Sequence, residues 1–478
     1  FRLSRDGGTM ILSDTGCQPV SAVSIPALES DQAYSLTENG WTKDLRPTPG
    51  LANTEENAVI AHEEIRKYNT TGLLITEIAA SVSGAEDWIE LHNEGAQAVD
   101  LSGYWLSDDV RHPRIWQFPQ GTVLQPDAYL IVYASGASAD ETEGLHAGFK
   151  LSADGEEAVA LSDPRGAIID RLFLGKQYKN LTYGRTSGEK ALRYFTTPSP
   201  GAKNPDSGYL GWAQPPQYSL SGGLYTSGQN LQVALTAPAG SRIYYTLDNT
   251  DPGEGATLYT APLSITSTTI LRTRVYRDGY IPSYMDSQSY LFDVNNGDGT
   301  VFVMSMVSDP DNLTGSERGI MNHSSEQWER EGHIEIFNPD GSTLVSQECG
   351  IKLHGEGSRV LDEKSFTIVA RNSYGDNRFR AAIFSRRPYT EYQSFLLRPS
   401  SEDSVMTRMR DAVLQSLVQD SSLMYQEVEV GVLYIDGVYW GHYNLRERIN
   451  SASICQFEGW EGQEDDIDLI KGNTQDMQ

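Results

Sequence analysis

Residues 427–450, EVEVGVLYIDGVYWGHYNLRERIN, decide how the C-terminal part of the chain folds. β-Branched and aromatic residues alternate with polar ones on both sides of Asp436-Gly437, a dipeptide typical of a tight hairpin turn. The stretch therefore predicts two strands joined at that turn, with Asp436-Gly437 at an exposed tip and with the side chains of Trp440 and Tyr443 largely buried. The second strand carries three large aromatic residues between positions 439 and 443 and ends in the charged run 446–448. A plain structural hairpin seldom combines these features, so we expect a functional role for this one.

The same hairpin carries the first resemblance to a known family. Residues 439–447, YWGHYNLRE, resemble the YWGxYxLxE signature of the CotH kinase family. The resemblance covers residues 301–473, and further segments follow in the order that the family has. These segments are residues 350–359 (GIKLHGEGSR), 364–366 (KSF), 374–376 (YGD) and 397–398 (LR).

Length and composition limit what the remainder can be. A chain of 478 residues predicts three or four domains. The net charge of −28 argues against non-specific nucleic-acid binding and against binding to an anionic membrane. No apolar run reaches the roughly 20 residues of a membrane-spanning helix. The three cysteines, Cys17, Cys349 and Cys455, form neither a disulfide framework nor a metal-binding pattern.

An internal repeat organises the N-terminal part. Residues 1–7 (FRLSRDG) return as 149–155 (FKLSADG), 12–14 (LSD) as 161–163, and 47–50 (PTPG) as 198–201 (PSPG). Residues 1–54 are therefore predicted to be the C-terminal half of a β-sandwich whose complete copy spans 73–204. Because half a sandwich has an unpaired edge, we expect residues 1–54 to borrow strands or the natural chain to be longer at this end.

The complete copy resembles the lamin-tail domain, an immunoglobulin-like β-sandwich. Three predicted strands carry the resemblance: residues 73–78 (LLITEI), 87–93 (DWIELHN) and 101–107 (LSGYWLS). One group of side chains in this copy offers metal-ligand chemistry: Glu86, Asp87, Glu90 and His92. We interpret these residues as strand and strand-end positions without a metal. The role expected for the domain is attachment or spacing.

A linker is predicted at 55–72, between residues 1–54 and the complete copy, and a second linker at 205–221, after that copy. A third module is predicted at 222–292, and the last module follows it. Its strands 243–248 (IYYTLD), 258–263 (LYTAPL) and 270–276 (ILRTRVY) resemble the immunoglobulin-like domain at the C-terminus of chitobiases and β-hexosaminidases. A glycosidase would also need a catalytic barrel of about 250 residues, for which no region exists. Asp248 and Asp251 are therefore expected to stabilise a turn rather than to act as catalytic carboxylates.

Residues 293–478 make up the last module. Strands are predicted at 332–339, 347–354 and 364–371, an amphipathic helix at 403–419, and then the hairpin. This is the order of elements in a protein-kinase N-lobe, and the CotH resemblance also implies a kinase-like fold. The predicted fold class is therefore multidomain and mainly β, with immunoglobulin-like sandwiches followed by an α+β kinase-like N-lobe that is truncated at residue 478.

Charge supports a phosphate-binding role for this module. Residues 351–400 hold nine Lys or Arg against five acids, in a chain that is otherwise acidic. We predict that Arg359, Lys364, Arg398 and Glu447 bind the cofactor. Lys364 is expected in a cleft under the hairpin, near Arg359 and within reach of Glu447 or of an acid on the 403–419 helix. If Lys364 does not contact the phosphates, Arg359 or Arg398 is expected to do so. The alternative for each arginine is an ion pair with an acid of the chain itself.

The resemblance implies a bacterial, extracellular or cell-surface protein kinase that transfers phosphate from ATP, with Mg²⁺, to hydroxyl groups of a protein substrate. Its catalytic and metal-binding acids are expected after Gln478, no metal ligand is assigned within the chain, and this fragment alone is expected to be inactive. A cell-wall or glycan surface is a further expected partner of the sandwiches. The rival hypothesis is a non-catalytic adhesion or scaffold protein with a degenerate kinase-like module.

Overall fold

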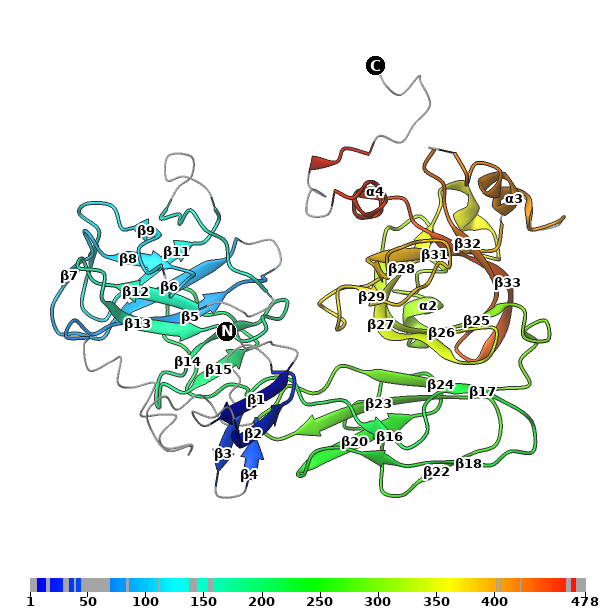
Figure 1. Cartoon of the computed structure of the whole chain (residues 1–478), viewed down its shortest axis with the longest axis horizontal. Helices are drawn as coiled ribbons and strands as arrows, with labels where there is room; N and C mark the ends of the chain where they lie inside the picture. Colours follow the sequence, from blue (N-terminus) through cyan, green and yellow to red (C-terminus); the bar gives the residue numbers. More distant parts are fainter. Residues whose placement is uncertain are drawn as a thin grey trace, which may run out of the picture. The chain divides into compact units, whose positions relative to one another are not determined.

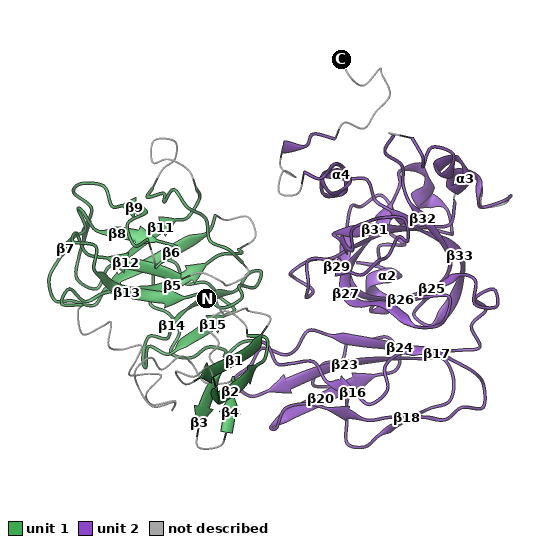
Figure 2. Cartoon of the chain, in the orientation of Figure 1, with its two compact units in different colours: residues 1–211 green, residues 212–478 purple. Residues whose placement is uncertain are grey.

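The chain divides into two compact units, residues 1–211 and residues 212–478 (Figure 2). The computed structural model describes residues 7–13, 18–28, 34–37, 40–43, 69–82, 86–110, 112–136, 144–153, 158–400, 403, 406–421, 423–460 and 466–469. Strands outnumber helices in both units, as Figure 1 shows, which confirms the mainly β prediction. Within the part of the chain that is described, no helix has the length and apolar character needed to cross a membrane.

Unit 1 begins with two short hairpins. They are formed by β1 (Gly8–Ser13) with β2 (Pro19–Ile25), and by β3 (Ser35–Thr37) with β4 (Gly40–Thr42). The register of the first hairpin returns in β12 (Ala158–Ser162) and β13 (Ile168–Phe173). Leu12 pairs with Ser21 as Leu161 pairs with Asp170, and the register shifts directly after the leucine in both hairpins. The sequence repeat is therefore also a repeat of strand pairing.

The strand order of the repeat agrees with the sequence, but two expectations about it are left open. Phe1, which the sequence aligns with Phe149, lies outside the described residues. That residues 1–54 are half of a sandwich stays a prediction. Strands β1 and β2 are largely exposed, whereas strand β12 is buried along its whole length.

The rest of unit 1 is a sandwich of two sheets. Its remaining strands are β5 (Leu73–Ala79), β6 (Trp88–Asn93), β7 (Val99–Asp100), β8 (Trp105–Ser107), β9 (Trp116–Gln117), β10 (Val123–Leu124), β11 (Tyr129–Tyr133), β14 (Thr182–Arg185) and β15 (Leu192–Phe195). One sheet has the order β11-β6-β5-β14-β15 and the other β13-β12-β8-β9, while β7 and β10 form a separate pair. Buried residues of both sheets, among them Ile89 and Leu161, share one apolar core, which is how a sandwich is stabilised.

Unit 2 begins with a smaller all-β part, residues 212–292. Its strands are β16 (Gln217–Tyr218), β17 (Gly223–Tyr225), β18 (Leu231–Val233), β19 (Leu235–Thr236), β20 (Ser241–Thr246), β21 (Thr257–Leu258), β22 (Leu263–Ile265), β23 (Thr269–Arg277) and β24 (Asp286–Phe292). The main sheet has the order β17-β24-β23-β20-β21, and β16-β19 and β18-β22 are two-stranded. Leu271, Val275 and Tyr290 contribute to its core.

Seven strands then close into a barrel. They are β25 (Phe302–Val307), β26 (Glu329–Phe337), β27 (Thr343–His354), β28 (Ser365–Val369), β31 (Ser394–Arg398), β32 (Val428–Ile435) and β33 (Val438–Glu447). The order around the barrel is β25-β26-β27-β28-β31-β33-β32, and the ring is visible in Figure 1. All neighbours are antiparallel except β25 and β32, whose parallel pairing closes the ring. A further pair, β29 (Phe379–Arg380) and β30 (Glu391–Tyr392), lies outside the ring.

The described helices of unit 2 are short: α2 (Pro310–Leu313), η1 (Gly357–Val360), α3 (Arg410–Ser416) and α4 (Ser451–Glu458). A closed barrel with so little helix does not confirm the α+β lobe. The predicted helix 403–419 is reduced to α3, which buries none of its residues. One cause is Asp403, whose carboxylate accepts hydrogen bonds from the backbone N–H groups of Met409 and Arg410 and so fixes the start of the helix.

The hairpin that opened the sequence analysis forms as predicted, with two corrections. Asp436 and Gly437 have φ values of 51° and 79°, as a type I′ turn requires. The turn is not an exposed tip, because Asp436 accepts a hydrogen bond of 3.0 Å from the backbone N–H of Ser308 and Gly437 lies against Ile270. Tyr443 is buried, as expected, whereas Trp440 is only partly buried.

Candidate functional site

The side chains of β33 alternate between the two faces of the barrel wall. Tyr443 and Leu445 belong to the core inside the barrel. Because the side chains of a strand alternate with a period of two, His442, Asn444 and Arg446 lie on the outer face. Glu447 follows Leu445 by two residues and therefore points inward. The charged run at the end of the hairpin is thus divided between two environments.

Glu447 forms a buried ion pair on the inner side. Its carboxylate accepts hydrogen bonds from Nε of Arg387 at 3.0 and 3.1 Å and from the hydroxyl of Tyr389. The side chains of Glu447 and Arg387 are 2% and 4% exposed. Glu447 also accepts a bond of 3.2 Å from the backbone N–H of Glu427, at the start of the hairpin. These contacts give Glu447 a structural role, because breaking such a buried pair is strongly destabilising.

Two arginines of the outer face converge on one carboxylate. Arg398 on β31 and Arg446 on β33 both bind Oδ2 of Asp411 on α3, the former at 3.2 Å. Nε and Nη2 of Arg446 and Nε of Arg398 are buried, and no described residue accepts a hydrogen bond from them. Two guanidinium groups and one carboxylate leave a net positive charge with unused donors.

The pKa shifts follow from this arrangement. Burial lowers the pKa of Arg446, an effect that the bond to Asp411 opposes. Burial raises the pKa of Asp411, but the bond from Arg446 and the charges of both arginines outweigh it, so the net pKa lies below its usual value. The carboxylate of Asp411 therefore stays ionised at neutral pH.

A hollow of about 510 Å³ lies beside these arginines. It is lined by residues 354–358, Leu361 and Arg398. The loop turns at Gly355, whose φ is 93° and whose missing Cβ leaves room for the hydroxyl of Ser358. The φ of 93° favours glycine there, because residues with a Cβ rarely adopt this backbone conformation. The hollow therefore combines a glycine-containing loop with a guanidinium group.

Lys364 and Arg359 support the loop. Nζ of Lys364 donates to the backbone carbonyls of Arg359 and Leu361 at 2.8 and 3.0 Å. Nη2 of Arg359 donates to Oε1 of Gln327 at 2.8 Å. Lys364 thus lies next to Arg359, as expected. The acid of the α3 helix, Asp411, binds Arg398 and Arg446 and not Lys364.

The four predicted cofactor-binding residues are therefore not one cluster. Arg398 lines the hollow, Arg359 and Lys364 brace the loop next to it, and Glu447 lies on the inner side with Arg387. Their role in binding a cofactor stays a prediction. The alternative raised for the arginines holds for several of them, since acids of the chain pair with Arg371, Arg380, Arg387 and Arg398.

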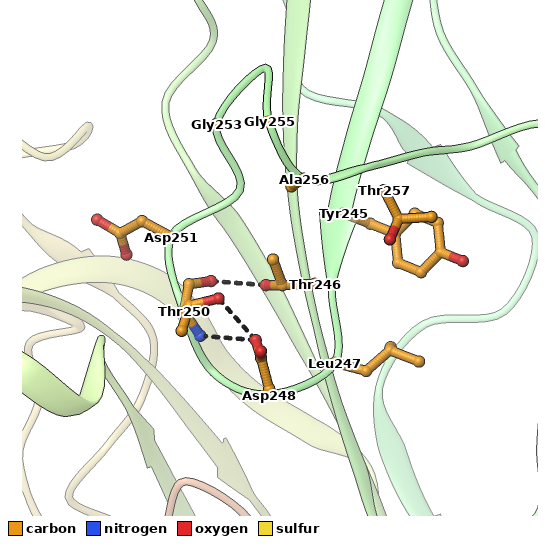
Figure 3. Close-up of a pocket in the computed structure, with 10 residues that line it drawn as sticks. All are labelled: Tyr245, Thr246, Leu247, Asp248, Thr250, Asp251, Gly253, Gly255, Ala256 and Thr257. Carbon is orange, nitrogen blue, oxygen red and sulfur yellow. Dashed lines mark hydrogen bonds between the residues drawn. The ribbon is translucent and has the colours of Figure 1, made fainter.

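A second hollow, of about 780 Å³, surrounds the loop that contains Asp248 and Asp251 (Figure 3). Asp248 accepts hydrogen bonds from both the backbone N–H and the hydroxyl of Thr250, at 3.2 and 2.6 Å. Asp251 points away from Asp248 in Figure 3 and pairs with Arg272 at 2.8 Å. The two carboxylates do not face a common point, which agrees with their expected role in the turn.

Two of the possible metal ligands in the lamin-tail-like copy, Glu90 and His92, contact different residues. Glu90 accepts hydrogen bonds from the hydroxyl of Thr76 and the backbone N–H of Gly201, each 2.7 Å long. Nε2 of His92 lies 3.1 Å from Oδ1 of Asp127. Glu90 and His92 therefore have partners within the sandwich, and the interpretation of the whole group stays a prediction. Of the cysteines, Cys349 and Cys455 are buried, and Cys17 lies outside the described residues.

Sequence reasoning missed Arg446 and Asp411 as members of the site. The signal for Arg446 was present, because the period of two that places Tyr443 inside the barrel also places Arg446 outside. Asp411 could not be found in this way, since its role depends on where α3 lies against β31 and β33.

Comparison with protein families gives three matches along the chain. Residues 66–176 match the lamin tail domain, residues 220–287 the chitobiase/β-hexosaminidase C-terminal domain, and residues 351–478 the CotH kinase protein family. The three resemblances read from the sequence are thus confirmed. No curated protein matches the chain. The hollow and its arginine pair both lie in the part that matches the CotH family.

Proposed function

We propose that the outer face of the barrel binds the phosphate groups of ATP, as part of a CotH-type kinase that phosphorylates protein hydroxyl groups. The observation that carries the proposal is the pair Arg398 and Arg446, which share one oxygen of Asp411 and keep buried N–H groups without an acceptor among the described residues. Guanidinium groups are well suited to phosphate oxygens because they offer parallel donors and a permanent charge.

The surroundings of the arginines support the same ligand. The loop at residues 354–358 borders the hollow, and the absence of side chains at Gly355 and Gly357 lets a ligand approach its backbone closely. Lys364 then acts as a positioning residue, because it holds the carbonyls of Arg359 and Leu361 at the far end of the loop. Phosphoryl transfer depends largely on such positioning and on cations around the phosphates.

Mg²⁺, which a kinase of this kind uses, does not fit the described lining. Mg²⁺ prefers several oxygen ligands in octahedral geometry. The hollow offers one carboxylate, Glu356, next to cationic and apolar groups. No described residue of the hollow is therefore assigned to metal chemistry.

The kinase-like lobe, the extracellular or cell-surface location and the attachment role of the sandwiches belong to the same proposal. Support for attachment comes from the two immunoglobulin-like family matches that precede the CotH match in the chain. The adhesion or scaffold hypothesis makes a different prediction for the barrel, since a scaffold has no reason to bind a nucleotide.

Calorimetric titration of this chain with ATP and with adenosine tests the proposal. We expect ATP to bind and adenosine to bind at least about tenfold more weakly, a difference of about 1.4 kcal/mol. Arg398→Gln should weaken ATP binding by a similar factor and leave adenosine binding unchanged, because the lost contact is to phosphate. Arg380→Gln is the matched control, since Arg380 is a half-exposed, ion-paired arginine of the same unit.

Three results would contradict the proposal. Equal binding of ATP and adenosine would show that the phosphate groups do not contribute to binding. Equal effects of Arg398→Gln and Arg380→Gln would show that the loss of ATP affinity comes from the lower positive charge of the protein and not from a contact at Arg398. No nucleotide binding at all would favour the scaffold hypothesis. Thermal unfolding of both variants checks that the barrel is folded.

A further inference from the structure

A second cluster of ligand-type side chains lies within unit 2, between the 212–292 part and the barrel. Asp286 stands on β24, His333 on β26 and Glu348 on β27. One ligand atom of each lies within 4.8 Å of the others. His333 and Glu348 are directly opposite in the β26–β27 ladder and are 2% and 8% exposed. None of these residues lines the hollow described above.

Contacts between the two parts bring Asp286 to this place. Oε2 of Glu335 accepts a hydrogen bond of 2.7 Å from the backbone N–H of Ser289. The hydroxyl of Ser289 also lies 2.7 Å from that of Ser305 on β25. Because both contacts attach β24 to the barrel, Asp286 at the start of β24 is held next to His333.

Partners within the protein satisfy only part of this cluster. Nδ1 of His333 lies 2.8 Å from Oε1 of Glu348, and its Nε2 lies 3.2 Å from the hydroxyl of Ser346. Oε2 of Glu348 is buried and has no hydrogen-bond partner among the described residues. A buried carboxylate oxygen without a partner loses its hydration and gains nothing in exchange.

The nearby cation Arg272 does not supply that partner. Its Nη1 forms an ion pair of 2.8 Å with Asp251 and also binds the carbonyl of Asn249. The side chain is fully buried, so its direction is fixed by these contacts. Among the described residues, no donor reaches the second oxygen of Glu348, which leaves this oxygen open to a ligand.

We propose that Asp286, His333 and Glu348 bind one divalent transition-metal ion, with Zn²⁺ as the first candidate, which fastens the 212–292 part to the barrel. An imidazole nitrogen with two carboxylates suits Zn²⁺ or Mn²⁺, whereas Ca²⁺ selects oxygen ligands alone. With Nδ1 on the metal, the Nε2–H of His333 donates to Ser346, which is the outer bond that metal-binding histidines usually make.

The geometry needs only a small adjustment to hold the ion. Zinc–ligand bonds of about 2.0–2.2 Å place neighbouring ligand atoms roughly 3–4 Å apart. The atoms of this cluster lie within 4.8 Å, so side-chain rotations suffice. The ion would replace the direct bond between His333 and Glu348 by two metal–ligand bonds.

Titration of the chelator-treated protein with Zn²⁺ tests the proposal. We expect one Zn²⁺ per chain and a higher melting temperature, because the ion binds the folded state. Co²⁺ should bind at the same place and give visible absorption bands, while Ca²⁺ should leave the melting temperature unchanged. Asp286→Asn and Glu348→Gln should each weaken Zn²⁺ binding at least tenfold.

His112→Ala provides the matched control. His112 is exposed and lies 2.9 Å from Asp109, so it forms a histidine–carboxylate pair, and the described residues give it no place in a cluster of three metal-ligand side chains. This variant should keep the full affinity for Zn²⁺. Should Glu348→Gln fail to fold, Asp286→Asn carries the test, because Asp286 is only partly buried.

Three outcomes would overturn the inference. They are Zn²⁺ binding equally strong in wild type and Asp286→Asn, binding lost in His112→Ala, and no saturable binding in the wild type. The last would mean that a proton shared by the buried carboxylates takes the place of the ion. None of these readouts depends on nucleotide binding, so the site can fail while the proposed function holds.

Discussion

At the scale of single residues, the buried carboxylates set how the molecule responds to pH. Glu90 and Glu77 lie opposite each other in the β5–β6 ladder and are fully buried. Burial raises the pKa of Glu90 from 4.5 to about 7, although hydrogen bonds from Thr76 and Gly201 lower it. Burial also raises the pKa of Glu77. The folded sandwich therefore binds these protons more tightly than the unfolded chain does.

The sign of the pH dependence follows. The contribution of Glu90 to stability is complete below about pH 4.5 and is lost as the pH rises through about 7, in total roughly 3 kcal/mol. Glu90→Gln should abolish this loss, because the amide can donate to Thr76 and accept from Gly201. Chemical unfolding of wild type and variant between pH 4 and pH 8 measures it.

Gln120→Ala supplies the control, because Gln120 is exposed in the same unit and has no titratable group, so this variant should keep the pH dependence of the wild type. Parallel curves for wild type and Glu90→Gln across the whole range would show that Glu90 does not titrate differently on folding.

Arg446 and Asp436 show what the sequence reveals about single residues. The β-strand alternation around Arg446 predicts its face of the barrel, and the Asp436-Gly437 dipeptide predicts the turn. Neither pattern identifies the residue that binds Arg446 or Asp436 in the folded protein. Asp411 reaches Arg446, and Ser308 reaches Asp436, through contacts between elements that are distant in sequence.

At the scale of elements, the two copies of the repeated hairpin differ in burial rather than in pairing. Leu161 on β12 is fully buried in the sandwich core, whereas Leu12 at the matching position of β1 is 64% exposed. Leu161→Ala should therefore destabilise the sandwich by about 2–5 kcal/mol. Leu12→Ala should change stability by less than about 0.5 kcal/mol.

Urea unfolding monitored by tryptophan fluorescence compares the two variants. A large loss of stability in Leu12→Ala would mean that the exposed face of β1 is covered in solution. Equal, small losses in both variants would contradict the core position of Leu161.

Element prediction succeeded where the pattern is local. The strands around 338–341, the strand after Lys364 and the 427–450 hairpin all form. The helix expected at 403–419 and the kinase-like lobe were less well predicted. Apolar spacing alone does not show that Asp403 restricts the start of α3, and strand order alone does not show that β25 and β32 meet to close a barrel.

At the scale of the whole molecule, unit 2 is joined by a core of its own between the 212–292 part and the barrel. Ile270 and Leu291 of the first part pack there with Val303, Phe337 and Val432 of the second. Apolar burial across both parts predicts that they unfold together.

Leu291→Ala should test this coupling, because Leu291 is fully buried in the shared core. We expect faster amide hydrogen exchange in both β24 and β25, which corresponds to a loss of about 2–5 kcal/mol in each. Leu258→Ala, at a position 44% exposed on β21, is the control and should change neither strand. Faster exchange confined to β24 would show that the two parts unfold independently.

The parallel pairing of β25 with β32 has a consequence for how the protein is made. One edge of β25 pairs with β26, which follows it closely in the chain, but Phe302 on the other edge pairs with Gly431, so that edge has no partner until β32 has been translated. Pairing between such distant segments is slow, and an unpaired apolar edge invites aggregation meanwhile. The 212–292 part is complete before β25 appears, and its residues Ile270 and Leu291 offer Val303 an apolar surface at once. We therefore expect the preceding domain to cover the apolar side of β25 during synthesis, before β32 is available.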